Sequence, residues 1–89
     1  MKAVITVVGE DRVGIIALTS AECAKHGVNI LDISQTVMQN YFCMIMLVEI
    51  STLSTSFKEF SEALAEAGAA VGVDIRVMHE DIFNSMHKI

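Results

Sequence analysis

The stretch KAVITVVGEDRVG, residues 2–14, begins the fold. Residues 2–8 are rich in β-branched side chains and stop at Gly9, which predicts a strand followed by a turn. We expect a helix next, over residues 13–26, with Asp11 as its N-cap and Gly27 as its C-terminal stop. The chain therefore opens with a strand and a helix joined by a short loop that contains glycine.

The remaining sequence predicts three more strands and a second long helix. Residues 28–39 and 41–51 are extended runs separated by a tight turn at Gln39 and Asn40, so they should pair antiparallel. Apolar and charged side chains recur at helical spacing after residue 56, which predicts the second helix. Apolar and charged side chains alternate over residues 73–77, which predicts a strand with one solvent-exposed face. The candidate caps of the second helix are Ser54, Thr55 and Ser56, and its candidate ends are Gly68 and Gly72.

This order predicts an α+β fold of the ferredoxin-like βαββαβ type, a four-stranded antiparallel sheet with two helices on one face. The expected spatial strand order is 4-1-3-2, so the first and third strands are central. Both central strands carry apolar residues on both of their faces. Because two helices cover only one face, we expect a partner chain or the C-terminal segment on the other. The alternative is an apolar surface that stays in water.

The length of 89 residues is enough for one domain and leaves no room for a separate cofactor-binding half. We expect residues 1–80 to form that domain and residues 81–89 to form a C-terminal helical extension. An acidic residue at its start, Asp81, and an apolar stripe of Ile82, Phe83, Met86 and Ile89 favour this short helix. The stripe should pack on the domain or on its partner.

Composition excludes several classes of function. An apolar content of 53% without proline indicates a folded chain, and a net charge of -5 argues against direct nucleic-acid binding. The longest apolar run, residues 41–48, is far shorter than the roughly 20 residues of a membrane helix, so we expect a cytoplasmic protein without a membrane partner. Cys23 and Cys43 have no metal-ligand spacing and are expected to be reduced core residues.

The loop of residues 9–14 is the best candidate site. It joins a strand to a helix, so its backbone amides and the positive end of the helix dipole can meet an anionic group. Glu10 and Asp11 would repel a dianion, whereas a free amino acid could give its carboxylate to the amides and its ammonium to Asp11 or Asn29. The alternative is purely structural: Asp11 is only an N-cap, and Gly14 only allows close packing of helix on sheet.

Other polar groups point to structure rather than chemistry. His26 falls in the last turn of the first predicted helix, where a capping role is favoured over catalysis. The group His79, Glu80, Asp81 and His87 has poor spacing for a metal site. No serine or cysteine has an activating neighbour. We therefore predict no catalytic residue, no metal, no cofactor and no enzymatic activity.

Two segments together resemble the ACT domain, a small regulatory module with the same βαββαβ fold. They are GEDRVGII, residues 9–16, and HGVNILDI, residues 26–33. The ending, HEDIF at 79–83 and MH at 86–87, resembles that of the short, stand-alone, uncharacterised ACT proteins of bacteria and archaea. A broader likeness is to the glycine cleavage system transcriptional repressor and to the N-terminal domain of formyltetrahydrofolate deformylase.

The resemblance implies a regulatory protein that forms a homo-oligomer, a dimer or a tetramer, and binds an amino acid between two copies. One departure from the family pattern is Val13, where proline is usual, and this leaves the loop less pre-set. The alternative is a ligand-free oligomerisation or interaction module that acts on a partner protein. The ligand-binding residues implied or predicted are Gly9, Glu10, Asp11, Arg12, Val13, Gly14, Ile15 and Asn29.

Overall fold

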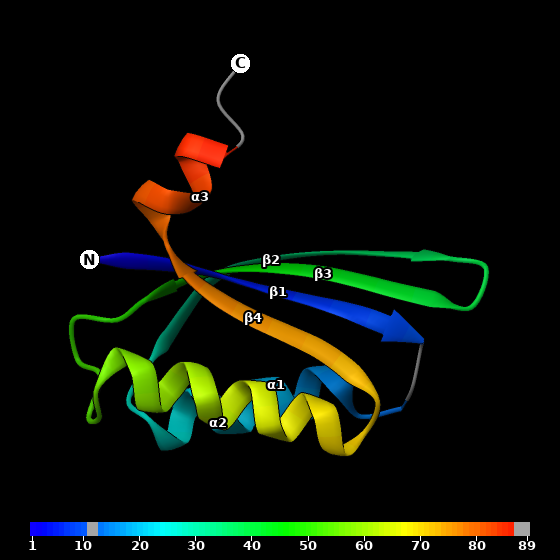
Figure 1. The fold of residues 1–89 in the computed structure, drawn as a ribbon, viewed down its shortest axis with the longest axis horizontal. Helices are drawn as coiled ribbons and strands as arrows, with labels where there is room; N and C mark the ends of the chain where they lie inside the picture. Colours follow the sequence, from blue (N-terminus) through cyan, green and yellow to red (C-terminus); the bar gives the residue numbers. More distant parts are fainter. Residues whose placement is uncertain (11–12, 87–89) are drawn as a thin grey trace.

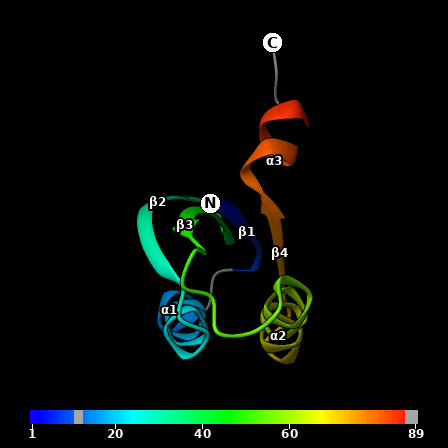
Figure 2. The ribbon, with the colours of Figure 1, turned by 90° about the vertical axis from the view of Figure 1, so that its left-hand side faces the viewer.

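The computed structural model describes residues 1–10 and 13–86, and they form the predicted ferredoxin-like arrangement. Figure 1 shows α1 and α2 side by side on one face of the sheet and α3 on the other side. Figure 2 shows the same layers from one end, with α1 below β2 and β3 and α2 below β4. The elements are β1 (Lys2–Glu10), α1 (Ile15–Lys25), β2 (Asn29–Met38), β3 (Tyr41–Glu49), α2 (Phe57–Ala70), β4 (Val73–His79) and α3 (Glu80–Met86).

The strands lie in the order β2-β3-β1-β4 with every neighbouring pair antiparallel, which confirms the predicted topology. Val7 of β1 shows the register at the centre of the sheet, since it lies opposite Met44 of β3 and Ile75 of β4. The same register places Gly9 beside Val73. The end of β1 and the start of β4 therefore lie together, and the start of α1 lies near the end of α2.

The core lies between the sheet and the two long helices. Alternate residues of the central strands point into it, and helix residues three or four apart meet them. The hydroxyl of Thr19 donates a hydrogen bond of 2.8 Å to the carbonyl of Ile15, so its burial leaves no unpaired polar atom on that side chain. Side chains fully buried in this layer include Ile5, Val7, Met44, Met46, Val48, Cys23, Phe60 and Leu64.

Helix α1 begins later than the sequence pattern predicts. Its N-cap is Gly14, at a φ of 90°, so the predicted start at residue 13 with Asp11 as the cap is wrong. Asp11 and Arg12 themselves lie outside the described residues. The other end agrees with the prediction, because His26 is the C-cap and Gly27 follows at a φ of 74°.

Helix α2 is capped by Ser56, whose hydroxyl accepts a hydrogen bond of 3.1 Å from the amide of Glu59. The helix continues to Ala70, so the alternative end at Gly68 is wrong. A Cβ atom at Gly68 would lie 2.6 Å from the carbonyl oxygen of Val73. This glycine allows α2 to approach β4 closely, and the helix ends before Gly72.

Two sequence-based expectations about single residues are also wrong. Gly9 lies within β1 rather than in a turn, and a Cβ atom there would lie 3.2 Å from the Cα of Val73. Cys43 is exposed rather than in the core, because β3 turns its side chain to the face without the long helices. Cys23 is buried, as expected.

The face opposite α1 and α2, called the open face below, is partly covered by the C-terminal segment. Val4 lies on it, beside Leu47 and Met78, yet is only 4% exposed. Helix α3 contacts β1 and β4, and Figure 1 places it on this side. Phe83 is half-buried, whereas Met86 is exposed and Ile89 lies outside the described residues.

Candidate functional site

The start of α1 has the geometry of a helix end that can receive an anion. The first helical hydrogen bond runs from the amide of Leu18 to the carbonyl of Gly14, at 2.9 Å. The amides of residues 15–17 therefore have no partner within the helix. No described side chain caps them, and the first turn of α1 holds no acidic residue. The first turn of this eleven-residue helix therefore brings no negative side chain of its own to the positive end of the helix dipole.

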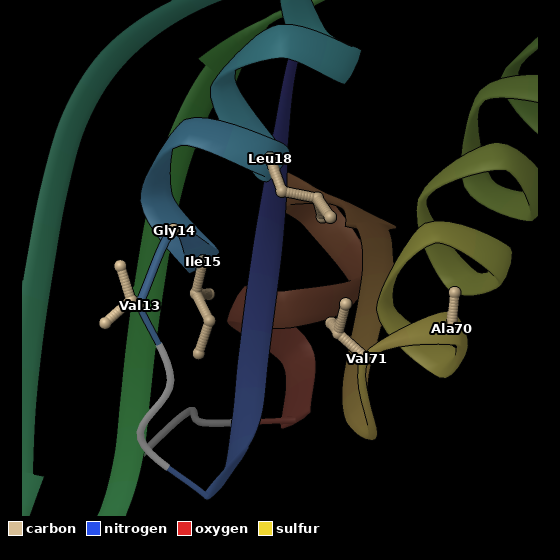
Figure 3. Close-up of a pocket in the computed structure, with 6 residues that line it drawn as sticks. All are labelled: Val13, Gly14, Ile15, Leu18, Ala70 and Val71. Atoms are coloured by element: carbon tan, nitrogen blue, oxygen red, sulfur yellow. The ribbon is translucent and has the colours of Figure 1, made fainter.

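A cavity of about 520 Å³ lies between this helix start and the end of α2. Figure 3 shows Leu18 of α1 and Val71, which follows α2, pointing into the space between the two helices. Val13 points away from Val71 and is fully exposed. The walls that the described residues provide carry aliphatic side chains and backbone. The lining residues are Val13, Gly14, Ile15, Leu18, Ala70 and Val71.

A second hollow, of about 280 Å³, lies on the other side of Gly14 and Ile15. It is bounded by the first turn of α1 and by Gln35 and Val37 of β2. A Cβ atom at Gly14 would meet nothing within 4 Å. Close packing of helix on sheet therefore does not require glycine at this position. The φ of 90° does, because residues other than glycine rarely adopt it.

The structure brings only some of the predicted site residues together. Val13, Gly14 and Ile15 line the cavity, and Gly9 and Glu10 end the strand that leads to it. Asp11 and Arg12 lie outside the described residues, so their predicted contacts are not tested.

Asn29 lies at the far end of the sheet. It pairs with Glu49, which in turn pairs with Lys2, whereas Gly9 pairs with Phe42. At about 3.3 Å per strand residue, these ends are about 23 Å apart. The loop and Asn29 of one chain therefore do not form one site. A site that contains both needs a second copy.

Three cavity residues were missed by sequence reasoning: Leu18, Ala70 and Val71. More than 50 positions separate Leu18 from Ala70, and neither has a distinctive pattern around it. The signal lay in the predicted strand order. If the first and fourth strands are antiparallel neighbours, the end of the first must lie beside the start of the fourth, and the preceding helix must end there.

At the C-terminal end of α1, His26 contacts the loop that precedes α2. Its Nδ1 lies 3.0 Å from the hydroxyl of Thr55, and its carbonyl accepts a hydrogen bond of 2.8 Å from the amide of Ser54. Its Nε2 is 3.5 Å from a carboxylate oxygen of Glu22, and its ring packs edge-on against Phe60. These contacts support the predicted capping role of His26 rather than a role in catalysis.

The described residues offer no assembled catalytic or metal centre. No group of three or more His, Cys, Asp and Glu side chains within residues 1–10 and 13–86 could hold a metal ion. Burial raises the pKa of Cys23 to about 11, with a smaller contribution from the negative charge of Glu22, so this thiol stays protonated at neutral pH. No helix in the described part of the chain is long and apolar enough to cross a membrane.

The family model of the ACT domain matches residues 2–78. The chain belongs to the ACT domain family. A UPF0237 protein of Clostridium acetobutylicum is 52% identical over 89 residues, with 100% of both chains covered. A UPF0237 protein of Methanocaldococcus jannaschii is 49% identical over 88 residues, 99% of this chain and 98% of that protein. The resemblance to short bacterial and archaeal members is thus confirmed.

Solved structures of other proteins share this fold. An ACT domain protein from Streptococcus pneumoniae is 41% identical, has a TM-score of 0.80, and covers 93% of each chain. A putative glycine cleavage system transcriptional repressor has 25% identity and a TM-score of 0.70 over 86% of this chain and 44% of that chain. A formyltetrahydrofolate deformylase from Pseudomonas syringae has 26% identity and a TM-score of 0.78, over 88% of this chain and 27% of the enzyme. Both broader likenesses are confirmed.

Membership defines the general class of function. ACT domains are typically regulatory modules that bind small molecules, and the members named above match the whole chain as a separate protein. The family therefore points to a regulatory domain without a catalytic centre.

Proposed function

We propose that this ACT protein is a stand-alone cytoplasmic regulator that forms a homo-oligomer, a dimer or a tetramer, and binds an amino acid or a similar small zwitterion to regulate metabolism. The observation that carries the proposal is the cavity of about 520 Å³ at the start of α1, whose first turn holds no acidic residue. A volume between about 300 and 1,000 Å³ is typical of small-molecule sites.

The chemistry around the start of α1 fits a zwitterion. The amides of residues 15–17, which have no partner within the helix, and the helix dipole favour a carboxylate. Glu10 and Asp11 precede the helix and favour an ammonium over a second negative charge. The aliphatic walls at Leu18 and Val71 accept an apolar side chain, so aliphatic amino acids are the first to test.

Asn29 enters this proposal only from a neighbouring copy. Its amide group can donate to a ligand carboxylate and accept from an ammonium. Since the strand register keeps Asn29 away from the loop of its own chain, ligand binding and assembly would be linked. A ligand held between two copies would stabilise the oligomer, and this linkage is the proposed regulatory signal.

A thermal-shift screen of the twenty amino acids tests the proposal, followed by calorimetry on those that raise Tm. A ligand at 100 times its Kd should add about 2.7 kcal/mol of stability. Ala70→Phe should fill the cavity and abolish the shift. Ala65→Phe, an exposed position on the same helix that does not line the cavity, is the matched control and should bind normally.

Asn29→Ala tests whether a second copy contributes a side chain to the ligand site. Asn29 is exposed at the start of β2, so its removal should leave the fold intact. We expect weaker ligand binding at an unchanged folded fraction. Equal binding by this variant and the wild type would remove Asn29 from the site without affecting the rest of the proposal.

The second candidate function is a ligand-free interaction module that acts on a partner protein by assembly alone. The apolar residues exposed on the open face favour it, because such a surface suits a protein partner better than a small molecule. If none of the twenty amino acids shifts Tm or gives heat in calorimetry, this function replaces the ligand-binding one.

A further inference from the structure

The uncovered part of the open face carries an apolar patch on neighbouring strands. Val8 of β1 lies beside Cys43 of β3, and Tyr41 of β3 lies beside Met38 of β2. Their exposed fractions reach 67% at Met38. The long helices cover the other face, so nothing in the described chain packs on these side chains. The open-face patch consists of Val8, Met38, Tyr41, Cys43 and Ile45.

Helix α3 carries a second exposed apolar surface. Ile82 and Met86 are four positions apart, so they lie on one side of the helix, and they are 51% and 64% exposed. No residue of α3 is buried. Seven residues are too few for a helix to be stable in water without packing contacts. In Figure 1, α3 rises away from the sheet rather than lying flat on it.

The two surfaces occupy opposite ends of the same face. Helix α3 stands at the end marked by Val4, whereas the patch lies toward Gly9 and Tyr41. At 1.5 Å per residue, the seven-residue α3 is about 10 Å long, so the open face has a step of about that height where α3 rises from the sheet. Two such stepped faces fit together when one copy is turned by 180°, because each raised end then lies over the other's bare end.

We propose that a second copy of this chain covers the open face, with α3 of each protomer packed on the open-face patch of the other. The inference rests on the homo-oligomer named in the proposed function and specifies one of its surfaces. The cavity lies on the side of α1 and α2 (Figure 2), so the proposed contact with Asn29 of another copy belongs to a different interface, as in a tetramer. Each contact occurs twice about a two-fold axis, which closes the assembly as a dimer. The axis passes near Thr6 and Ile45, which are paired near the middle of the face.

The area and charge of the face fit this occupant. Four strands and seven paired residues span about 19 Å by 23 Å, a flat area of about 440 Å². Side-chain relief and the two α3 helices add to it, toward the about 800 Å² per partner of a standard interface. The patch has no charged residue, and on β4 Asp74 is paired with Arg76 at 3.1 Å. On β1, Glu10 pairs with Tyr41 and so brings one carboxylate to the edge of the patch.

Charge substitutions test which surface is used. Ile45→Asp and Ile82→Asp should each convert the dimer into a monomer in light scattering at micromolar concentration. Ile82 lies on the protruding helix, so its replacement leaves the core intact even if Ile45→Asp reduces folding. Val37→Asp is the matched control, since Val37 is similarly exposed but pairs with the buried Phe42 and so lies on the other face. It should leave the dimer unchanged.

Cross-linking tests the exchange of α3. A chain with Cys43→Ser and Met86→Cys is mixed with a tagged wild-type chain and treated with a short bismaleimide. We expect a cross-linked heterodimer through Cys43 of the wild-type chain, identified by mass spectrometry. A chain with Cys43→Ser and Glu62→Cys, in which the new thiol is on the exposed side of α2, should give none.

A dimer that withstands Ile45→Asp and Ile82→Asp but is dissociated by Val37→Asp would overturn the inference in favour of contact along β2. A wild-type monomer would also overturn it. The ligand screen, run on the same variants, separates the two proposals. Amino-acid binding without this dimer overturns only the docking surface, and this dimer without amino-acid binding overturns only the ligand-binding function.

Discussion

Neighbouring residues of β3 lie in opposite environments. Met46 is fully buried beneath α1 and α2, whereas Ile45 is 42% exposed on the open face. Both are large apolar residues of one strand, so their chemistry does not explain the difference; the placement of the helices does. Apolar residues on a strand therefore show that a face is suited to burial, but only the fold shows which face the chain itself covers.

The largest difference between the faces should appear on truncation of these two neighbours. Met46→Ala leaves a cavity in a packed core and should lower the free energy of unfolding by about 2 to 5 kcal/mol. Ile45→Ala, measured on the monomeric Ile82→Asp background, should cost much less because its surroundings are solvent. Urea denaturation measures both. Equal losses would mean that the open face is as well packed as the covered one.

The two cysteines report the same contrast chemically. Cys23 is buried and its pKa is raised to about 11, whereas Cys43 is exposed on the open face. At pH 8 only about 0.1% of a thiol with that pKa is ionised. On the Ile82→Asp background, maleimide should modify Cys43 at least about 100-fold faster than Cys23. Similar rates, measured by mass spectrometry on digested protein, would contradict the burial of Cys23.

Close packing on the covered face makes Gly68 sensitive to a single methyl group. Gly68→Ala would place its Cβ 2.6 Å from the carbonyl oxygen of Val73 and 2.7 Å from a side-chain carbon of Ile75. We expect a loss of about 1 to 3 kcal/mol in the free energy of unfolding. The control, Ala65→Gly on the exposed side of α2, should cost about 1 kcal/mol or less. A Gly68→Ala protein as stable as the wild type would show that α2 can move away from β4.

The sequence predicted the fold better than the site. The strand that contains residues 41–48 and the order of the strands follow from local patterns, and both are confirmed. The positive φ of Gly14 and the cavity wall at Ala70 and Val71 follow from how separate segments meet. The residue type of Cys43 predicts a place in the core, but its parity with Ile45 puts it on the open face.

The smallest expected effect is electrostatic and belongs to the open face. Glu49 accepts a hydrogen bond of 2.8 Å from the N-terminal ammonium and others from Ser51. The ammonium, followed by the Ser51 hydroxyl, lowers the pKa of Glu49 to about 2. Because the pKa is lower in the folded protein, this carboxylate stabilises the fold fully above its ordinary pKa of 4.5, and the contribution is lost as pH falls to about 2.

Glu49→Gln should therefore reduce the fall in stability between pH 4.5 and pH 2, measured as the urea midpoint at several pH values. Ser51→Ala removes the hydroxyl donor but keeps the ammonium and the amide of residue 51, so it should give an intermediate pH dependence. Salt should reduce the effect in the wild type, since Glu49 is partly in water. Parallel pH profiles for wild type and Glu49→Gln would mean that the ion pair does not hold in solution. The end of the open face beneath α3 would then depend on the packing of Val4 rather than on charge.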